Sequence, residues 1–319
     1  MKMKNEIRIT GLIIAAGLAA APVVASAQDE RTATQIDTTV RLDRGGSVDL
    51  SLISGKIRVT GWDQPNVKIS ASIESGNLRF SSNSSRVTLS VDDEGDGERR
   101  HRHRDSGDAR YDVSVPRGAK LILEAVSGDV TAKGSQGEIE ATSVSGDVDV
   151  TDGARSVSVE SVSGSARAAQ VNGRLRAETV SGELRAENVT GEVEASTVSG
   201  DITLTGIQST DVRTETVSGE IRYTGSIEPA GRYSYESHSG TIVLNIPRNA
   251  GASFSVETFS GGVNADFPIT IPPRERSVGR NREGHMEFTI GDGRARITAQ
   301  TFSGEIQINS GTTTRRNDE

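Results

Sequence analysis

Residues 173–190 read GRLRAETVSGELRAENVT, which is two nine-residue halves that each begin with glycine. After each glycine, apolar residues stand at the second, fourth and seventh places, as Leu175, Ala177 and Val180 do in the first half. The second and fourth places alternate with charged residues, which is typical of a strand with one buried face. The odd step from the fourth to the seventh place predicts a turn, after which another apolar side chain is buried. Glycine then supplies the backbone freedom that a sharp corner needs.

A Val-Ser-Gly phrase closes every second half of this repeat. Its regular copies recur every 18 residues: Val126-Ser127-Gly128, Val144-Ser145-Gly146, Val162-Ser163-Gly164, Val180-Ser181-Gly182 and Val198-Ser199-Gly200. Drifted copies are Ile53-Ser54-Gly55, Val217-Ser218-Gly219, His238-Ser239-Gly240, Phe259-Ser260-Gly261 and Phe302-Ser303-Gly304. A period of about 20 residues is typical of stacked repeats. We interpret the phrase as a corner in which valine fills the core, serine satisfies backbone groups and glycine allows the bend.

Two halves form one coil of about 18 residues with two short strands, and the chain then returns to the same wall. The sequence therefore predicts an all-β fold, a β-solenoid resembling a parallel β-helix, with irregular capping strands at both ends. The expected inward residues of one wall are Ile139, Val157, Leu175, Val193 and Val212. Those of the other wall are Val130, Val148, Ala166, Leu184, Ile202 and Ile221. Inward alanines at 132, 141, 168, 177, 186 and 195 predict walls that lie close together. An antiparallel meander of nine-residue units is the alternative.

The ends of the chain predict export. Residues 1–27 combine Lys2, Lys4 and Arg8 with an apolar run and the small residues Ala25-Ser26-Ala27, so they read as a signal peptide cleaved before Gln28. An uncleaved anchor is the alternative. Residues 28–39 are expected to be a disordered or extended leader, 40–308 a single adhesin-like solenoid domain with regular repeats at 121–223, and 309–319 a polar tail. We expect the protein in the periplasm, at the outer-membrane surface or outside the cell, without stable membrane insertion after cleavage.

Composition narrows the possible partners and the sources of stability. The formal net charge of −8 repels phosphate backbones, so nucleic acid is not an expected partner. With no cysteine, stability must come from packing and backbone pairing. Aromatic residues make up only 3% of the chain, which suits the thin interior of a solenoid better than a conventional core.

Two segments interrupt the strand pattern. Residues 92–108 form an acidic and then basic loop insertion, in which His101 and His103 offer a weak metal site and the arginines offer a site for an anionic polymer. A second loop begins at Pro272-Pro273 and ends near Gly284. It precedes a hairpin-like pair, 286–290 and 295–301, joined by Gly291-Asp292-Gly293.

Several of these motifs resemble one bacterial family. They are the Gly61-Trp62-Asp63 turn after an alternating strand, the serial Val-Ser-Gly repeats, and the segment from Gly291-Asp292-Gly293 to Phe302-Ser303-Gly304-Glu305-Ile306. Together, over 40–308, they resemble the family named "putative adhesin", β-strand-repeat proteins classed as a domain of unknown function. The resemblance implies an exported β-solenoid. It brings no catalytic or binding residue with it, and the 92–108 insertion departs from the family pattern.

A search for reactive groups finds carboxylates at outward corner positions. They form one column, Asp129, Asp147, Glu183, Asp201 and Glu220, which Arg167, Arg185 and Arg222 would partly neutralise. A solvated face is the interpretation we adopt for this column. A catalytic pair acting on glycans is one alternative, and calcium binding is another, although the paired glycines of calcium-binding β-rolls are missing. No catalytic, cofactor-binding or metal-binding residue is predicted, and no cofactor.

The sequence thus predicts a non-catalytic, exported β-solenoid that acts as an adhesin or as a binding scaffold of the cell envelope. Its partner would be a glycan or a protein of the envelope or of another surface. The alternatives are a glycan-active lyase or hydrolase on the same scaffold, and an envelope-stress or assembly protein whose solenoid end pairs with a partner strand. The sequence names neither the ligand nor the oligomeric state.

Overall fold

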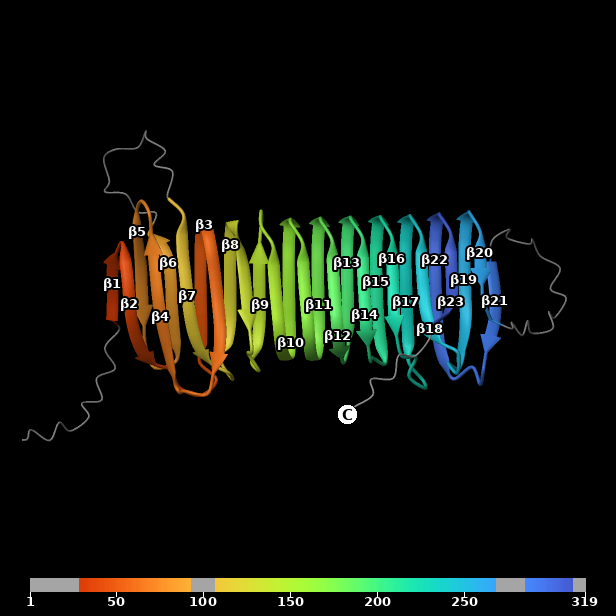
Figure 1. Cartoon of the computed structure of the whole chain (residues 1–319), viewed down its shortest axis with the longest axis horizontal. Coiled ribbons are helices and arrows are strands. Elements are labelled where there is room, and N and C mark those ends of the chain that lie inside the picture. Colours follow the sequence, from red (N-terminus) through yellow and green to blue (C-terminus); the bar gives the residue numbers. More distant parts are fainter. Residues whose placement is uncertain (1–28, 93–106, 268–284, 312–319) are drawn as a thin grey trace, which may run out of the picture.

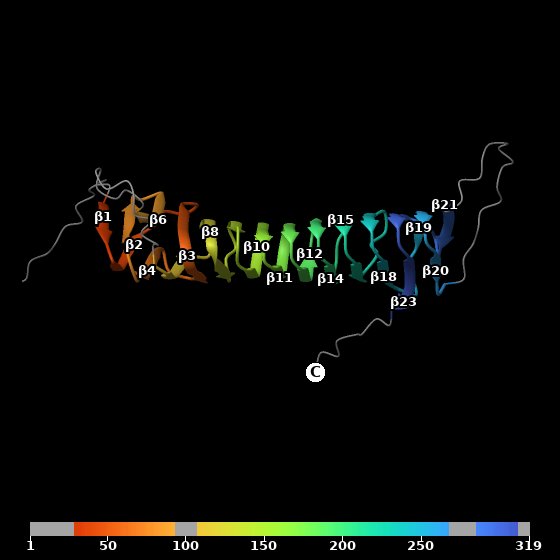
Figure 2. The ribbon, with the colours of Figure 1, turned by 90° about the horizontal axis from the view of Figure 1, so that it is seen from above.

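In the computed structural model, residues 29–92, 107–267 and 285–311 are described, and all their regular secondary structure is β-strand. The strands form one continuous hydrogen-bonded sheet that coils into a long, narrow stack (Figures 1 and 2). Their bounds are β1 (Asp29–Ala33), β2 (Gln35–Arg41), β3 (Ser47–Trp62), β4 (Asn66–Ile73), β5 (Asn77–Ser82), β6 (Arg86–Asp92), β7 (Ala109–Pro116), β8 (Lys120–Lys133), β9 (Glu138–Ser143), β10 (Val148–Ser163), β11 (Ala166–Ser181), β12 (Leu184–Thr190), β13 (Val193–Ser199), β14 (Ile202–Ile207), β15 (Asp211–Ser218), β16 (Ile221–Gly225), β17 (Arg232–Ser239), β18 (Ile242–Pro247), β19 (Ala252–Ser260), β20 (Val263–Ala265), β21 (His285–Ile290), β22 (Ala295–Ser303) and β23 (Ile306–Gly311).

The predicted solenoid is confirmed in the body of the chain. Parallel β10 and β11 pair with Val148 beside Ala166 and Val157 beside Leu175, which is a shift of one 18-residue coil. We call the wall that contains β9, β13, β15 and β17 the first wall, and the wall that contains β12, β14, β16 and β18 the second wall; β8, β10 and β11 run through both. Antiparallel pairing occurs only at the two ends of the described stack, so the alternative of an antiparallel meander is wrong for the repeats.

Every predicted inward residue of both walls is buried, including the alanines. The apolar side chains at the second and fourth places of each half alternate with exposed or half-buried polar ones, as in the pattern of β9 and β13. Small alanines at the fourth place let the two walls pack closely. Because each coil contacts mainly its neighbours, stability in such a stack is a sum of coil and interface contributions.

The Val-Ser-Gly corner differs from our interpretation of it. Strand alternation continues through the sixth place, so Ser143, Ser161 and Thr179 are the buried residues, and the valine that follows each of them points outward. The buried hydroxyl donates to the carbonyl of a corner glycine in the preceding coil, as from Ser143 Oγ to Gly128 O at 2.9 Å. The prediction that valine fills the core is therefore wrong. The serine of the phrase stacks in register but is exposed at all six regular positions from 127 to 218.

The glycine of the phrase is required by close backbone approach. A Cβ atom on Gly200 or Gly219 would lie 2.0 Å from the carbonyl oxygen of the corner glycine in the preceding coil. A column of such glycines lets successive coils stack at the corner. The expectation that glycine is needed for the bend is not confirmed, because Gly128, Gly146, Gly164 and Gly182 have no positive φ, whereas the contact between coils applies to every regular copy.

The opposite corner uses a different device. Residues at 18-residue intervals, Gly134, Asp152, Gln170, Asn188 and Gly206, all adopt positive φ, from 54° to 73°. This left-handed residue resets the alternation, so the apolar seventh place points inward here, and Val171, Val189 and Ile207 are buried. The predicted step from the fourth to the seventh place is thus correct at this corner only.

The outermost strands at each end of the stack do not follow the order of the chain. At the N-terminal end, β3 lies between β8 and the outer strands β6 and β7, while β4, β5, β2 and β1 add antiparallel pairs. At the C-terminal end, β22 lies between β17 and β19, and β23 lies between β18 and β20 (Figure 1). The predicted irregular capping strands are present.

The predicted hairpin near the C-terminus is wrong. Strands β21 and β22 follow one another in sequence, but β19 lies between them, antiparallel to β21 and parallel to β22. Near the N-terminus, β1 and the first part of β2 fall within the expected leader 28–39, so the paired, extended structure begins before residue 40. The predicted signal peptide and the second loop lie wholly outside the described residues, as do 93–106 of the insertion and 312–319 of the polar tail.

Three buried tyrosines replace smaller inward residues where the regular repeats end. Tyr223 packs edge to face against Tyr233 and Tyr235, with ring centroids 6.2 and 5.5 Å apart. The Tyr233 hydroxyl donates to Ser209 O at 2.6 Å and accepts from Glu228 N at 2.8 Å. The fully buried Tyr235 hydroxyl has no hydrogen-bond partner among the described residues, and burial raises the pKa of this phenol well above its ordinary value.

This contrast predicts opposite effects of two similar substitutions. Tyr235→Phe removes an unsatisfied buried hydroxyl and should raise the free energy of unfolding by about 1 kcal/mol. Tyr233→Phe removes two hydrogen bonds and should lower it by about 1–2 kcal/mol. Urea unfolding of the two variants beside the wild type measures the difference. A loss of stability in Tyr235→Phe as large as that in Tyr233→Phe would show that the Tyr235 hydroxyl is hydrogen-bonded.

Candidate functional site

An exposed apolar ladder runs along the Val-Ser-Gly corner. The six valines at 126, 144, 162, 180, 198 and 217 are 45–52% exposed, although valine is usually a core residue. The register of the strands continues the ladder to His238, Phe302 and then Phe259, because β22 lies between β17 and β19. We call these nine residues the corner ladder. At about 4.8 Å per coil, the corner ladder is about 40 Å long.

The C-terminal end of the corner ladder is aromatic. The rings of His238 and Phe302 are stacked with centroids 5.0 Å apart and planes 5° apart, and Phe259 stacks on the other face of Phe302 at 4.8 Å. Phe259 is 76% exposed, the largest value among the exposed apolar residues of the described chain. Contiguous exposed apolar surface of this kind marks an interaction site more often than scattered single residues do.

A row of polar residues, many of them acidic, flanks the corner ladder on the first wall, two places before each apolar residue. We call it the acidic rim; its members in stacking order are Glu124, Thr142, Glu160, Glu178, Ser196, Glu215, Glu236, Gln300 and Glu257. Open depressions lie between the rim and the ladder, of about 390 Å³ beside the valines and about 840 Å³ beside the aromatic end. Within the described chain, no cation forms an ion pair with Glu215, Glu236 or Glu257.

The corner carboxylates on the other side of the ladder are used by the fold. The side chain of Asp147 accepts from Ser165 N at 2.8 Å, and that of Asp201 accepts from Glu220 N at 2.8 Å, so each carboxylate caps a backbone donor of the next coil. Arg185 pairs with Glu183 at 2.5 Å. Arg222 pairs with Glu220.

These contacts partly correct our interpretation of the column as a solvated face, because several of its carboxylates are structural acceptors. Arg167, which we expected beside the same column, pairs instead with Glu187 at 3.0 Å.

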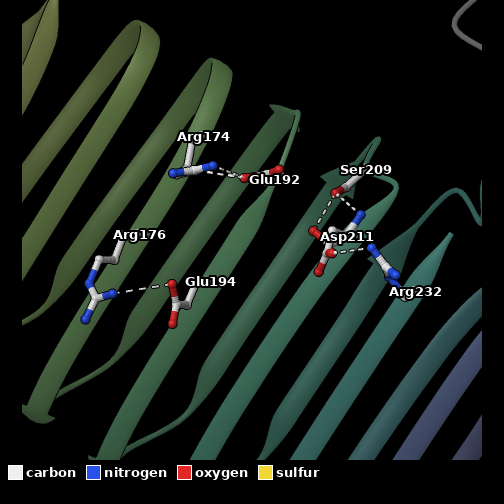
Figure 3. Close-up of polar contacts among 7 residues, drawn as sticks. All are labelled: Arg174, Arg176, Glu192, Glu194, Ser209, Asp211 and Arg232. Atoms are coloured by element: carbon white, nitrogen blue, oxygen red, sulfur yellow. Dashed lines mark hydrogen bonds and ion pairs between the residues drawn. The ribbon is translucent and has the colours of Figure 1, made fainter.

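The outer face of the first wall carries charges that are matched between coils (Figure 3). Arg174 pairs with Glu192 at 2.6 Å, and Arg176 with Glu194 at 3.4 Å, each across one coil. Farther along, Asp211 lies 3.8 Å from Arg232. Exposed pairs of this kind add little stability each, but at these positions they leave the arginines and carboxylates matched, in contrast to Glu215, Glu236 and Glu257 of the acidic rim.

The described residues contain no group of three or more His, Cys, Asp or Glu side chains placed to hold a metal ion. His101 and His103, the weak metal pair of the sequence, lie outside the described residues. No described segment forms a helix with the length and apolarity needed to cross a membrane.

Sequence reasoning missed the corner ladder because it placed the valines in the core. A usable signal was present, since the alternation from Ile139 through Ala141 reaches Ser143 before Val144. Following the two-residue period without a break would have placed Val144 outside.

Comparison with known proteins identifies a family but no ligand. The model of the family described as Toastrack DUF4097 matches residues 32–189, 104–225 and 133–309. No curated protein matches the sequence.

Solved structures that are similar to this chain include the following two. A "putative cell adhesion protein" from Clostridium sporogenes is 11% identical over 89% of this chain and 100% of its own, with a TM-score of 0.19. A "Putative lipid binding protein" from Parabacteroides distasonis is 11% identical over 87% of this chain and 96% of its own, with a TM-score of 0.37. At this identity and these TM-scores, neither says what this chain binds.

Proposed function

Since this chain belongs to the Toastrack DUF4097 family, the resemblance expected from its sequence, we propose that it is a non-catalytic binding scaffold of the cell envelope whose binding surface is the corner ladder. We propose export as well, on the signal-peptide pattern of residues 1–27, to the periplasm, to the outer-membrane surface or out of the cell. The single observation that carries the proposal is the series of exposed apolar residues from Val126 to Phe259, in which His238 is the one ladder residue that is not apolar. A soluble protein that needed no partner there would be expected to place polar residues at these positions.

The architecture suits binding better than chemistry. A stack of parallel coils presents the same position every 4.8 Å or so, which makes a long, repetitive surface and not a single converging site. In the described chain, the corner carboxylates that a glycan-active enzyme would use cap backbone donors or pair with arginine, as Asp147 and Glu183 do. The glycan-active alternative therefore gains no support from the geometry.

Removing the apolar character of the ladder should remove binding without unfolding the protein. We expect the full chain to co-sediment with isolated bacterial envelopes and the triple variant Val162→Ser/Val180→Ser/Val198→Ser to bind about tenfold more weakly. Each substitution removes exposed apolar area that a partner would cover. A tenfold weakening corresponds to a loss of about 1.4 kcal/mol of binding free energy over the three substitutions together. Co-sedimentation over a range of protein concentrations measures it.

The matched control is Thr131→Ser/Thr203→Ser/Thr224→Ser. These outward residues lie on the second wall, so the control has a similar loss of β-branched side chains without touching the corner ladder. Equal binding by the control and the wild type is expected. Equal binding by the valine variant would show that the ladder is not the binding surface, and absence of wild-type binding would end the envelope-binding proposal.

A further inference from the structure

We propose that the partner of the corner ladder is a cationic amphipathic α-helix of another protein, which lies along the ladder with its basic residues against the acidic rim. The inference rests on the proposed function, because it names the partner of the same surface. Three properties of the surface carry it: the unpaired charges of Glu215, Glu236 and Glu257, the spacing of the ladder, and the fully hydrogen-bonded backbone beneath it.

Charge complementarity selects a basic partner. Glu215, Glu236 and Glu257 have no ion-pair partner in the described chain, and each stands two places before an apolar or aromatic ladder residue. A strand spacing of about 3.3 Å per residue places such positions about 7 Å apart, so one partner can touch both rows. Lysine or arginine beside an apolar stripe matches this arrangement. A basic side chain over Phe259 would add a cation–π contact at the most exposed ring.

The backbone of the ladder leaves no room for an added strand. Each coil of the body is hydrogen-bonded to a coil on both sides, as β11 is to β10 and β13. A partner that lies along the ladder therefore meets side chains only, and it gains nothing from exposing its own backbone groups. An α-helix satisfies its backbone internally, which favours it as the occupant.

The spacing of the ladder also fits a helix. One helical turn rises 5.4 Å against about 4.8 Å between coils, so a helix of three turns stays within about 2 Å of register. If the partner were an extended strand, the side chains on one of its faces would repeat at about 6.7 Å. They would be out of register with the ladder by about 2 Å at the first step. Apolar residues three or four apart on the helix would thus lie between successive ladder residues.

The other apolar partners are disfavoured by the same charges. Two copies of this chain joined ladder to ladder would bring two acidic rims together, and like charges that face each other across an interface cost binding energy. An anionic lipid surface meets the same repulsion. The apolar ladder is also only one side chain wide, because exposed serines lie beside it at 127, 145, 163, 181 and 199. A broad lipid surface would therefore cover polar side chains as well.

The test uses the full chain and three fluorescein-labelled peptides of 18 residues or so. The first peptide combines leucine and lysine in a helical amphipathic pattern, the second replaces each lysine by glutamate, and the third scrambles the first. By fluorescence anisotropy, we expect the leucine–lysine helix to bind at least about tenfold more tightly than either other peptide. The difference should shrink in 1 M salt, where the Debye length is about 3 Å.

Two variants separate the charges from the apolar surface. We expect Glu215→Gln/Glu236→Gln/Glu257→Gln to weaken binding of the leucine–lysine helix about tenfold at low salt, and Phe259→Ser/Phe302→Ser to weaken it about tenfold at any salt. The charge-matched control is Asp37→Asn/Asp43→Asn/Asp152→Asn, three exposed acids that line none of the depressions along the Val-Ser-Gly corner, and it should bind as the wild type does. A control that weakens binding as much as the rim variant does would overturn the proposal, because net charge alone would then explain it.

The remaining outcomes distinguish this inference from the function on which it rests. Envelope binding that depends on Val162, Val180 and Val198, together with no binding of the leucine–lysine helix, overturns the helix and keeps the scaffold. Ladder-dependent binding to phosphatidylcholine vesicles, or ladder-dependent dimerisation in analytical ultracentrifugation, overturns the helix in favour of lipid or a second copy. Peptide binding unchanged in Phe259→Ser/Phe302→Ser overturns the proposed site.

Discussion

Leu184→Asp should prevent the solenoid from folding. Leu184 is fully buried on β12, between Ala166 of β11 and Ile202 of β14 in the stack. Burying a carboxylate without a partner costs several kcal/mol, and losing the leucine adds about 2–5 kcal/mol. The total is comparable to the whole stability of about 5–15 kcal/mol that is typical of a domain. Loss of the β-sheet circular dichroism signal and insolubility of the expressed chain would report the effect.

The control for this variant is Thr203→Asp on the adjacent strand β14. Thr203 faces outward in register with Arg185 on one side and Arg222 on the other, so the new carboxylate lies near two cations in water. Its effect on the free energy of unfolding should stay within about 1 kcal/mol. If Leu184→Asp unfolded at the same temperature as the wild type, Leu184 would not point into the core.

Gly219→Ala should cost about 3 kcal/mol or more. Gly219 has φ of +150°, and a Cβ atom there would lie 2.0 Å from Gly200 O and 2.6 Å from Gly200 C. These are backbone atoms of the adjacent coil, so they can retreat only if the two coils separate at the corner. Backbone strain at Gly219 and the separation of the two coils both lower the free energy of unfolding, so the substitution should be strongly destabilising. The midpoint of guanidinium unfolding measures the loss.

Gly118→Ala provides the comparison at an open position. No heavy atom lies within 4 Å of a Cβ atom built there, and its φ is outside the left-handed region. Alanine should be neutral or stabilise by about 0.4–1 kcal/mol, because it reduces the freedom of the unfolded chain. Similar losses in both variants would show that the corner glycines are not held by contact between coils.

The aromatic end of the corner ladder and the column of corner glycines share one cause, which is the stacking of coils in register. That stacking makes neighbours of Phe302 and Phe259, which are separated in the chain by more than 40 residues, including the strands β20 and β21. A prediction of the site from sequence would have had to know that β22 inserts between β17 and β19. Nothing in the local pattern of either strand carries this information, because both have the same inward alternation.

The sequence by itself determined the coil and its core. The second and fourth places of each half predict Leu175, Leu184 and their equivalents as inward residues, and all are buried, because a two-residue period is a property of any strand. Glycine at fixed intervals likewise predicted the corners.

Only the tertiary structure decided which way the seventh place points. Val180 and Val189 occupy the same place in consecutive halves, yet Val180 is 45% exposed and Val189 is fully buried. The difference comes from the left-handed backbone of Asn188, which shifts the alternation by one residue, whereas Thr179 continues it and turns its hydroxyl to Gly164 O in the preceding coil. Asparagine tolerates a left-handed φ better than β-branched threonine does, but Gln170 adopts the same φ at this corner, so residue type alone does not decide the conformation.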